Sequence, residues 1–339
     1  MEKIDWGNLT FGYTETSYNV RIKYRNGVWG EIEESNSAYI PIHIAATCLH
    51  YGQEAFEGVK AFRGIDGKVR IFRMRTNAER LQSSCRATLM PELPVETFCG
   101  MVERAIKLNS RYIPPYGTGA ALYIRPLLIG TGPQVGVKPS EEYTCIIFVT
   151  PAGPYQKEFR TSNYALIRSY DRAAPLGTGS YKVGGNYAAG LRADKIAHEA
   201  GYSGALYLDS KEKRYIDEFS SANFIGIKGN SYITPKSDSI LPSVTNRSLM
   251  QIAADNGMDV EVRRIPVEEL TELDEAGACG TAAVILPVER IDDIDTGRIY
   301  VISKDGMPGP VLTRLYHQLQ DIQYGIAPDP YGWTTEIDV

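Results

Sequence analysis

The segment GTGSYKVGGNY, residues 177–187, places Lys182 among glycines and between two tyrosines. Lysines are usually solvated surface charges, whereas flanking glycines allow a backbone to approach a ligand closely. Three interpretations suit a lysine in such a segment: a phosphate-binding loop, a reactive amine and an ordinary exposed loop. Each makes a different demand on the neighbouring residues.

Two nucleotide-binding motifs do not match this segment. A P-loop requires Ser or Thr directly after its lysine, because the hydroxyl binds Mg²⁺, and Val183 stands there instead. The dinucleotide fingerprint G-x-G-x-x-G requires glycine three residues after Gly179, which is the position of Lys182. The segment is therefore not a nucleotide phosphate loop.

The composition is that of a globular protein with a large core. Of the 339 residues 43% are hydrophobic, and the formal net charge is −5. This length favours two domains, and the lack of a basic block argues against a nucleic-acid partner. No signal-peptide pattern opens the sequence, and no apolar run approaches the roughly 20 residues of a membrane span. We therefore expect a cytoplasmic protein.

The cysteines and histidines indicate neither disulfides nor a metal site. The five cysteines are scattered, odd in number and free of C-x-x-C spacing, which is typical of reduced, buried thiols. The four histidines show no ligand spacing with those cysteines. No metal is therefore expected.

The first half of the chain is predicted to be a small α/β domain. Asn26-Gly27 and Asp66-Gly67 are turn signals between runs that alternate apolar and polar residues, so two hairpins are expected. The expected strands are 20–24, 28–32, 61–63, 69–72, 120–129 and 144–149, and an amphipathic helix is expected over 98–106.

A helix start is predicted at Thr76. Thr76 and Glu79 have the spacing of a capping box, in which each side chain bonds a free backbone amide of the other residue. This start places Arg80 in the first turn. Taken alone, an arginine at such a position is more often a solvated helix residue.

The second half is predicted to be a larger domain with a four-strand meander. Proline, glycine and charge interrupt the pattern at 153–161, which we interpret as the linker between domains 1–152 and 162–339. The expected strands are 205–208, 214–218, 224–227 and 232–234, and the expected helices are 186–200, 243–256 and one starting at Pro310 and capped by Gly325. The tail, 326–339, is expected to be irregular.

A reactive Lys182 must be neutral, so it needs burial or nearby positive charge to lower its pKa. Perturbed lysines are rare, and spacing alone therefore favours the exposed loop. Other segments of the chain change this balance.

Six ordered segments resemble the branched-chain aminotransferases, members of the fold-type IV group of pyridoxal-phosphate (PLP) enzymes. They are LHYGQEAFEGVKAFR (49–63), LYIRPLLIGTGPQVGV (122–137), YKVGGNY (181–187), EFSSANFI (218–225), LPSVTNRSL (241–249) and GTAA (280–283). The resemblance spans about Phe11 to Gly325. It implies an α+β, two-domain fold, in which 162–339 is the PLP-binding domain with a mainly antiparallel sheet or barrel.

The resemblance implies a role for several residues at the cofactor ring. Lys182 matches the lysine that forms the Schiff base with PLP and then shuttles the substrate proton. Tyr187 matches the tyrosine that hydrogen-bonds the phenolic oxygen of the ring, and Glu218 matches the carboxylate at the pyridine nitrogen. Strand alternation puts Asp217 on the opposite face from Glu218, so only one of them can point at the ring.

The phosphate is expected to have three anchors. The resemblance assigns Arg80, whose guanidinium suits a phosphate. Val244 and Thr245 lie at a predicted helix start, where free amides favour an anion. Thr281 adds a hydroxyl and an amide.

The resemblance also implies a substrate site that accepts both an apolar and an acidic side chain. Its expected residues are Tyr51, Phe56, Tyr123, Arg125, Tyr155, Ser221, Ala282 and Val137. Arg125 is assigned to the γ-carboxylate of glutamate, although a structural ion pair is also plausible for an arginine inside a strand. In the family, Tyr51 and the loop bearing Val135 and Val137 reach the neighbouring subunit, which implies a homodimer or a higher homo-oligomer.

The predicted activity is that of an L-branched-chain amino acid:2-oxoglutarate aminotransferase, which acts on leucine, isoleucine and valine. One rival is another fold-type IV enzyme, either a D-amino acid transaminase or an aminodeoxychorismate lyase. D-specific relatives tend to show R-x-H where this chain has Tyr123-Ile124-Arg125, which disfavours that rival. A second rival is a catalytically silent protein that merely binds PLP or a partner.

Overall fold

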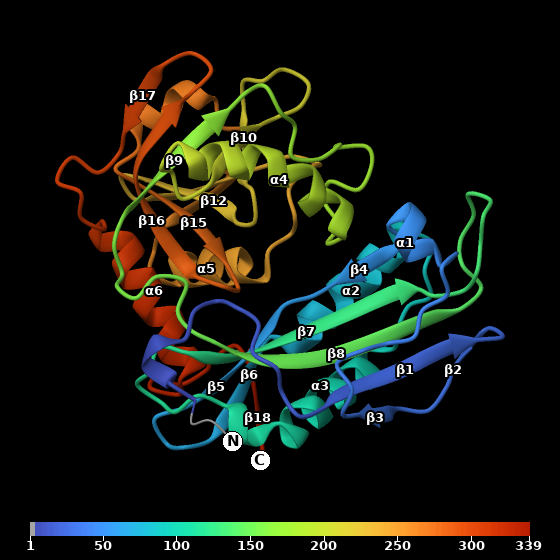
Figure 1. Cartoon of the computed structure of the whole chain (residues 1–339). Coiled ribbons are helices and arrows are strands. Elements are labelled where there is room, and N and C mark those ends of the chain that lie inside the picture. The colour runs from blue at the N-terminus through green and yellow to red at the C-terminus, as the bar shows by residue number, and fades with distance from the viewer. Residues whose placement is uncertain (1–3) are drawn as a thin grey trace. The chain divides into compact units, whose positions relative to one another are not determined.

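The computed structural model describes residues 4–339, which divide into two compact units (Figure 1). Unit 1 comprises the chain up to Tyr155, Tyr181–Gly184 and Asp321–Val339. Unit 2 comprises Gln156–Ser180 and Gly185–Gln320. The first change of unit falls within the predicted linker, whereas two segments of the predicted second domain, one of which carries Lys182, belong to unit 1.

Unit 1 is built on an antiparallel sheet. In sheet order its strands in the described part of the chain are β18 (Thr334–Ile337), β6 (Val69–Phe72), β5 (Val59–Arg63), β7 (Ala121–Gly130), β8 (Tyr143–Ala152), β1 (Asn19–Arg25) and β2 (Val28–Trp29), with β3 (Glu33–Ser35) paired to β1 and β4 (Glu54–Phe56) to β7. Both predicted hairpins are confirmed. Asn26 and Gly27 have φ of 52° and 82°, as a tight turn between twisted strands requires.

The helices of unit 1 cover its sheet. They are α1 (Thr47–Tyr51), α2 (Met74–Ala87) and α3 (Val95–Leu108), with short 3₁₀ turns η1 (Trp6–Asn8) and η2 (Ser110–Tyr112). α2 and α3 pack against each other, and α3 packs on β1, β7 and β8 (Figure 1). The apolar face predicted for α3 is confirmed, because Phe98, Met101 and Ile106 are buried in the core.

Two predictions for unit 1 are wrong. α2 begins at Met74 rather than Thr76, without a side-chain cap, so Arg80 lies in its second turn. The amide of Arg73 donates instead to the carbonyl of Trp333 (2.6 Å), a contact with the C-terminal tail that the local pattern of the sequence does not reveal. The tail itself is not wholly irregular, since β18 pairs with β6.

Unit 2 contains a closed barrel. In the described part of the chain the ring runs β11 (Ile216–Phe219), β10 (Ala205–Leu208), β9 (Ser162–Ile167), β16 (Val284–Asp293), β15 (Glu275–Gly280) and β12 (Asn223–Lys228), and it closes because β12 pairs with β11. β13 (Ser231–Pro235) and β14 (Asp259–Arg263) extend the sheet from β12, and β17 (Arg298–Val301) pairs with β16. The predicted meander is confirmed as β10–β13, and most of the pairs are antiparallel.

The remaining helices are α4 (Gly184–Glu199), α5 (Val244–Asp255) and α6 (Pro310–Gln323), with the 3₁₀ turn η3 (Val267–Glu272). All three match predicted helices to within a few residues. Ala193 and Ala197 of α4 are buried against β9 and β10, and α5 packs on β14 and β15. Within residues 4–339, no helix has both the length and the apolar character that crossing a membrane requires.

Candidate active site

The backbone of Lys182 is held within unit 1 by hydrogen bonds on both sides. Its amide donates to Ser84 Oγ of α2 (3.0 Å), and its carbonyl accepts from the amide of Phe56 in β4 (3.1 Å). The amide of Gly184 donates to the Glu54 carboxylate, and Val183 is buried in the core of unit 1. The glycine-flanked segment is therefore an anchored part of unit 1 and not a free loop.

The environment of the Lys182 amine meets the demand that a reactive lysine makes. Burial, assisted by the positive charge of Arg80, lowers the pKa of Lys182 to about 8, while Glu57 opposes the shift. Nζ lies 4.6 Å from the centroid of the Phe56 ring. A substantial fraction of this amine is consequently neutral near pH 8.

Arg80 is oriented by a buried ion pair. Its Nε and Nη2 donate to Glu57 Oε1 and Oε2 at 2.7 and 2.8 Å, and Nη2 also lies 3.4 Å from Asn77 Oδ1. Glu57 follows β4 directly, and its side chain is 0% exposed. The sheet thereby fixes the plane of the guanidinium on α2.

Tyr123 and Arg125 lie two residues apart on β7, so their side chains share one face of the sheet. Arg125 Nη2 donates to Tyr123 Oη (3.0 Å), and the guanidinium lies 4.8 Å from the Phe56 ring centroid. A methyl group on Gly58 would lie only 2.3 Å from Tyr123 Oη, so a glycine is needed there. Three of the predicted substrate residues are therefore in contact in unit 1.

Other predicted substrate residues of unit 1 are more exposed. Tyr155 lies near Phe11, which in turn makes an edge-to-face contact with Tyr123 at 5.1 Å. Tyr51, at the end of α1, donates its hydroxyl hydrogen to the carbonyl of Val135. Val137 is 87% exposed.

In unit 2, Glu218 is a buried carboxylate with charged and neutral partners. Arg172 Nη2 lies 2.9 Å from Oε1, the amide of Leu241 donates to Oε1 (3.2 Å), and Asn223 Nδ2 donates to Oε2 (2.7 Å). Asp217 instead accepts from Ser239 Oγ. The two neighbouring acids thus have different partners, as strand alternation predicts.

The start of α5 has the geometry of an anion site. Ser243 caps the helix, with Oγ accepting from the amide of Asn246 (3.1 Å). The amides of the first helical residues, Val244 and Thr245, have no acceptor within the helix. The helix dipole adds a partial positive charge at this end.

Thr281 and Ala282 form the turn between β15 and β16. The turn ends at Val284, whose φ of 63° is rare for a β-branched residue. A methyl on Gly280 would lie 3.8 Å from the carbonyl of Ser221, which places this turn beside the β11–β12 turn. Tyr187 lies in the first turn of α4.

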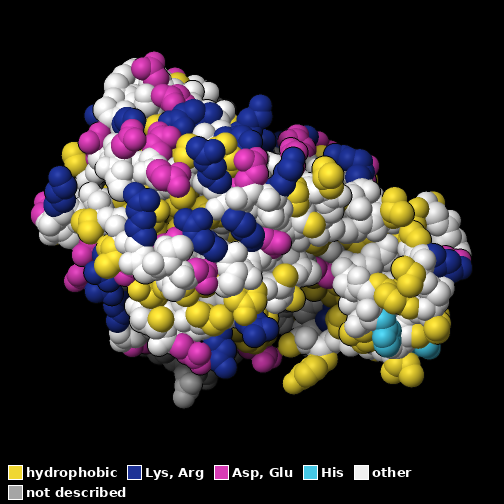
Figure 2. All heavy atoms as spheres, turned by 90° about the horizontal axis from the view of Figure 1, so that it is seen from above, with side chains coloured by type: hydrophobic (Ala, Val, Ile, Leu, Met, Phe, Trp, Pro, Cys, Tyr) yellow, Lys and Arg dark blue, Asp and Glu magenta, His cyan; other side chains and the backbone are white. Residues whose placement is uncertain are grey.

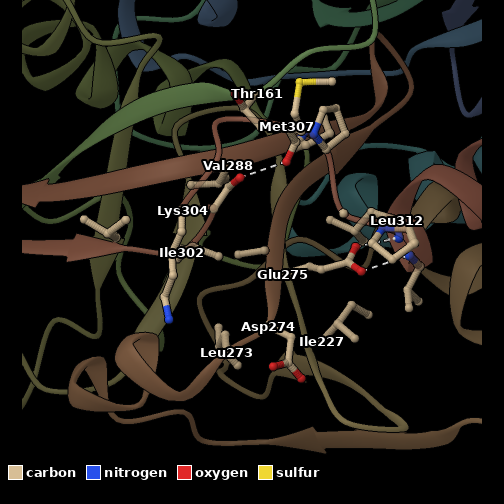
Figure 3. A pocket seen from close by; sticks show the side chains of 18 of the residues that line it. Thr161, Ile227, Leu273, Asp274, Glu275, Val288, Ile302, Lys304, Met307 and Leu312 are labelled. Atoms are coloured by element: carbon tan, nitrogen blue, oxygen red, sulfur yellow. Dashed lines mark hydrogen bonds between the residues drawn. The ribbon is translucent and has the colours of Figure 1, made fainter.

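A cavity of about 760 Å³ in unit 2 lies elsewhere (Figure 3). Glu275 lines it and accepts from the amides of Val311 (2.9 Å) and Leu312 (2.8 Å), which satisfies the first turn of α6 (Figure 3). None of the predicted site residues is among the described residues that line this cavity.

Sequence reasoning missed the residues that position the predicted ones. Glu54 and Glu57 lie inside the quoted segment 49–63, where carboxylates in an apolar strand region are a signal that could have found them. Ser84 and Arg172 carry no comparable signal, because their partners are distant in sequence.

Comparisons with known proteins agree with this geometry. The family described as "Amino-transferase class IV" matches residues 54–291, and the chain belongs to this family. The chain is 43% identical over 345 residues, covering 100% of both chains, to a branched-chain-amino-acid aminotransferase of Haemophilus influenzae.

Solved structures are similar over most of the chain. The branched-chain amino acid aminotransferase of Escherichia coli superposes with a TM-score of 0.81 at 26% identity, covering 96% of this chain and 100% of that one. A bacterial branched-chain amino acid aminotransferase complexed with N-(5'-phosphopyridoxyl)-L-glutamate, from the source abbreviated T.th., has a TM-score of 0.78 at 26% identity, covering 95% and 99%. The fold-type IV architecture, the transaminase class and the PLP cofactor predicted from the sequence are thereby confirmed.

Proposed function

We propose that this protein is an L-branched-chain amino acid:2-oxoglutarate aminotransferase. The observation that carries the proposal is the desolvated Lys182 amine, anchored in a chain that is 43% identical over its full length to a branched-chain-amino-acid aminotransferase. A silent binding protein would have no need to hold a lysine in this costly environment.

The donor set fits PLP. Lys182 is the amine for its aldehyde, and Glu218 supplies an anion for its pyridine nitrogen. Arg80, Thr281 and the first amides of α5 suit the phosphate, and Tyr187 is assigned to the phenolic oxygen. When bound, PLP supplies a ring that withdraws the electron pair released as the substrate Cα–H bond breaks.

In this assignment Lys182 has two successive duties. It first holds the cofactor, and once the substrate amine has displaced it, its neutral Nζ removes the Cα proton and returns it at C4′. The lowered pKa of Lys182 favours both duties, because a protonated amine could neither attach nor accept a proton.

Phe56 and Tyr123 supply an apolar wall for the branched side chains. Arg125, which shares their face of unit 1, is assigned to the γ-carboxylate of glutamate. Tyr155 and Ser221 extend this substrate set, and the amides of Thr281 and Ala282 are assigned to the α-carboxylate.

A homodimer accounts for an exposed apolar patch on unit 1, made by Ile44, Leu49, Val135 and Val137. The amide of Gln134 donates to the carbonyl of Ala45 (2.8 Å), which brings the two loops of this patch together. Figure 2 shows hydrophobic side chains gathered beside histidines on one face of the surface. Such patches are typical of protein interfaces, and Tyr51 lies at this one.

Sedimentation of the purified chain tests the dimer. Val137→Asp should produce monomers and lower activity, because Val137 is assigned to the partner's substrate site. Val28→Asp, at an exposed position outside the patch, is the matched control and should remain dimeric. The predicted cytoplasmic location remains a prediction, which fractionation of the native cells would test.

Two measurements test the activity. Borohydride reduction of the PLP-loaded protein followed by peptide mapping should label Lys182, and steady-state assays should show turnover of L-leucine, L-isoleucine and L-valine with 2-oxoglutarate. Turnover of D-alanine but not L-leucine would support the D-amino acid transaminase instead. A chain that stays colourless and unlabelled with PLP would overturn the proposal.

A further inference from the structure

Arg172 joins three segments of unit 2 through one buried guanidinium. Its side chain is 6% exposed, and its Nη2 lies 2.9 Å from Glu218 Oε1. The same nitrogen donates to the carbonyls of Gly179 (2.8 Å) and Ser239. These carbonyls belong to the loop that leads to Lys182 and to the loop that leads to α5.

The charge of Arg172 distinguishes it from the other described donors to Glu218. Asn223 Nδ2 and the amide of Leu241 are neutral, whereas a guanidinium is always protonated. A buried carboxylate loses much of its hydration, and a neighbouring positive charge favours its ionised form. Asp217, which accepts from Ser239 Oγ, is a second carboxylate close enough to feel this charge.

This charge bears on where a shared proton resides. When Glu218 meets a pyridine nitrogen, one proton can lie on the nitrogen, giving an ion pair, or on the carboxylate, giving a neutral pair. In a buried site without further charge the neutral pair gains relative to the ion pair. A cation beside the carboxylate reverses this preference, because it stabilises the anion and leaves the proton on the nitrogen.

We propose that Arg172 is a positioning residue that keeps Glu218 anionic and thereby keeps the cofactor nitrogen protonated. The inference rests on the proposed function, because it requires Glu218 to contact PLP. A purely structural alternative exists, since Arg172 also ties two loops together. Gly179 packs so closely there that a methyl would lie 2.7 Å from the carbonyl of Ala174 and 2.8 Å from Ser239 Cα.

The test uses the full-length chain loaded with PLP that carries ¹⁵N in its ring. The variants are Arg172→Met, Arg172→Lys, Arg172→Gln, Glu218→Gln and the double variant Arg172→Met/Glu218→Gln. Arg168→Met is the matched control, because Arg168 also pairs with a fully buried carboxylate of unit 2, that of Asp293 (2.6 Å). The readouts are the ring ¹⁵N chemical shift, the single-turnover rate with L-leucine and the melting temperature.

Arg172→Met and Arg172→Gln should move the ¹⁵N signal toward that of an unprotonated pyridine and slow turnover by roughly 10- to 100-fold, the range of a charge-assisted hydrogen bond. Arg172→Lys should retain the protonated signal. In the Glu218→Gln background the loss of Arg172 should slow turnover little further. Arg168→Met should lower the melting temperature without changing the ¹⁵N signal.

An unchanged ¹⁵N signal in Arg172→Met, with only a lower melting temperature, would reduce Arg172 to a structural contact. If Arg172→Met does not fold, the comparison of Arg172→Lys with Arg172→Gln decides in the same way. Failure of the wild-type chain to bind PLP or to turn over L-leucine would instead contradict the proposed function, so the two failures are distinguishable.

Discussion

Glu57 and Arg80 form a buried ion pair with two hydrogen bonds, Oε1 to Nε at 2.7 Å and Oε2 to Nη2 at 2.8 Å. The carboxylate comes from the strand junction beside β4 and the guanidinium from α2, so the pair fixes a helix residue to the sheet. The arginine assigned to the cofactor phosphate is thus held in place before any ligand arrives, which spares binding the entropy of ordering a long side chain.

Glu57→Gln should destabilise the protein by about 3 kcal/mol, because it leaves the Arg80 charge buried without its counter-charge. Urea unfolding of the apo chain measures this free energy. Glu96→Gln is the surface control, since Glu96 is 77% exposed and pairs with Arg75 of α2. It should lose less than about 1 kcal/mol, and equal losses in the two variants would contradict the buried-pair argument.

Gly58→Ala should disturb the substrate wall. The new methyl would lie 2.3 Å from Tyr123 Oη, so the tyrosine must move and release Arg125 Nη2. We expect kcat/KM for L-leucine and for 2-oxoglutarate to fall by at least about 10-fold, as displaced positioning groups do.

Gly100→Ala is the matched control for that substitution. Gly100 is exposed in α3, and nothing lies within 4 Å of the added methyl. Alanine in a helix interior is more favourable than glycine by about 0.5–1 kcal/mol, so this variant should be slightly more stable and fully active. Loss of activity in Gly100→Ala as well would remove the steric explanation.

The sequence predicted most elements because their signals are local. Asn26-Gly27 specifies a tight turn by its backbone preferences, and Ser243 caps α5 as predicted. The start of α2 was wrong because a contact with Trp333, far along the chain, replaced the predicted capping box. The pairing of β18 with β6 was missed for the same reason: such partners are set by tertiary packing.

The candidate site divides in a similar way. Residues such as Lys182 and Glu218 could be assigned because they lie in ordered motifs. Arg172 and Ser84 could not, since each acts through a hydrogen bond to a residue that no spacing relates to it. Conversely, the anchoring of Lys182 in unit 1 follows from burial of Val183 and from three long-range hydrogen bonds, which become visible only in the fold.

Arg125→Met should change substrate preference rather than abolish catalysis. If Arg125 binds the γ-carboxylate, its loss should lower kcat/KM for L-glutamate by about 100-fold, because a charge-assisted contact is removed. L-Leucine carries no such charge and should lose less than about 5-fold through lost packing on Phe56. Half-reactions with each amino acid measure the two values, and a parallel loss would favour the structural ion pair or packing role.

The attachment of added PLP by apo Lys182 should depend on pH with a midpoint near 8. Only the neutral amine attacks an aldehyde, so the rate constant should rise with pH below this value and level off above it. Stopped-flow absorbance measures the rate. A rate that keeps rising up to the pKa of 10.5 of an ordinary lysine would contradict the desolvated amine.

Lys182→Met should abolish transamination yet stabilise the apo chain at pH 7. The folded pKa of Lys182 is lowered, so the unfolded chain binds the proton more tightly, and stability falls as pH drops from about 10.5 to 8. Methionine removes that penalty, and the gain in unfolding free energy should vanish above pH 10.5. Lys195→Met, at an exposed position on α4, should gain nothing at either pH. A destabilised Lys182→Met chain would show that the amine forms favourable contacts that outweigh its desolvation.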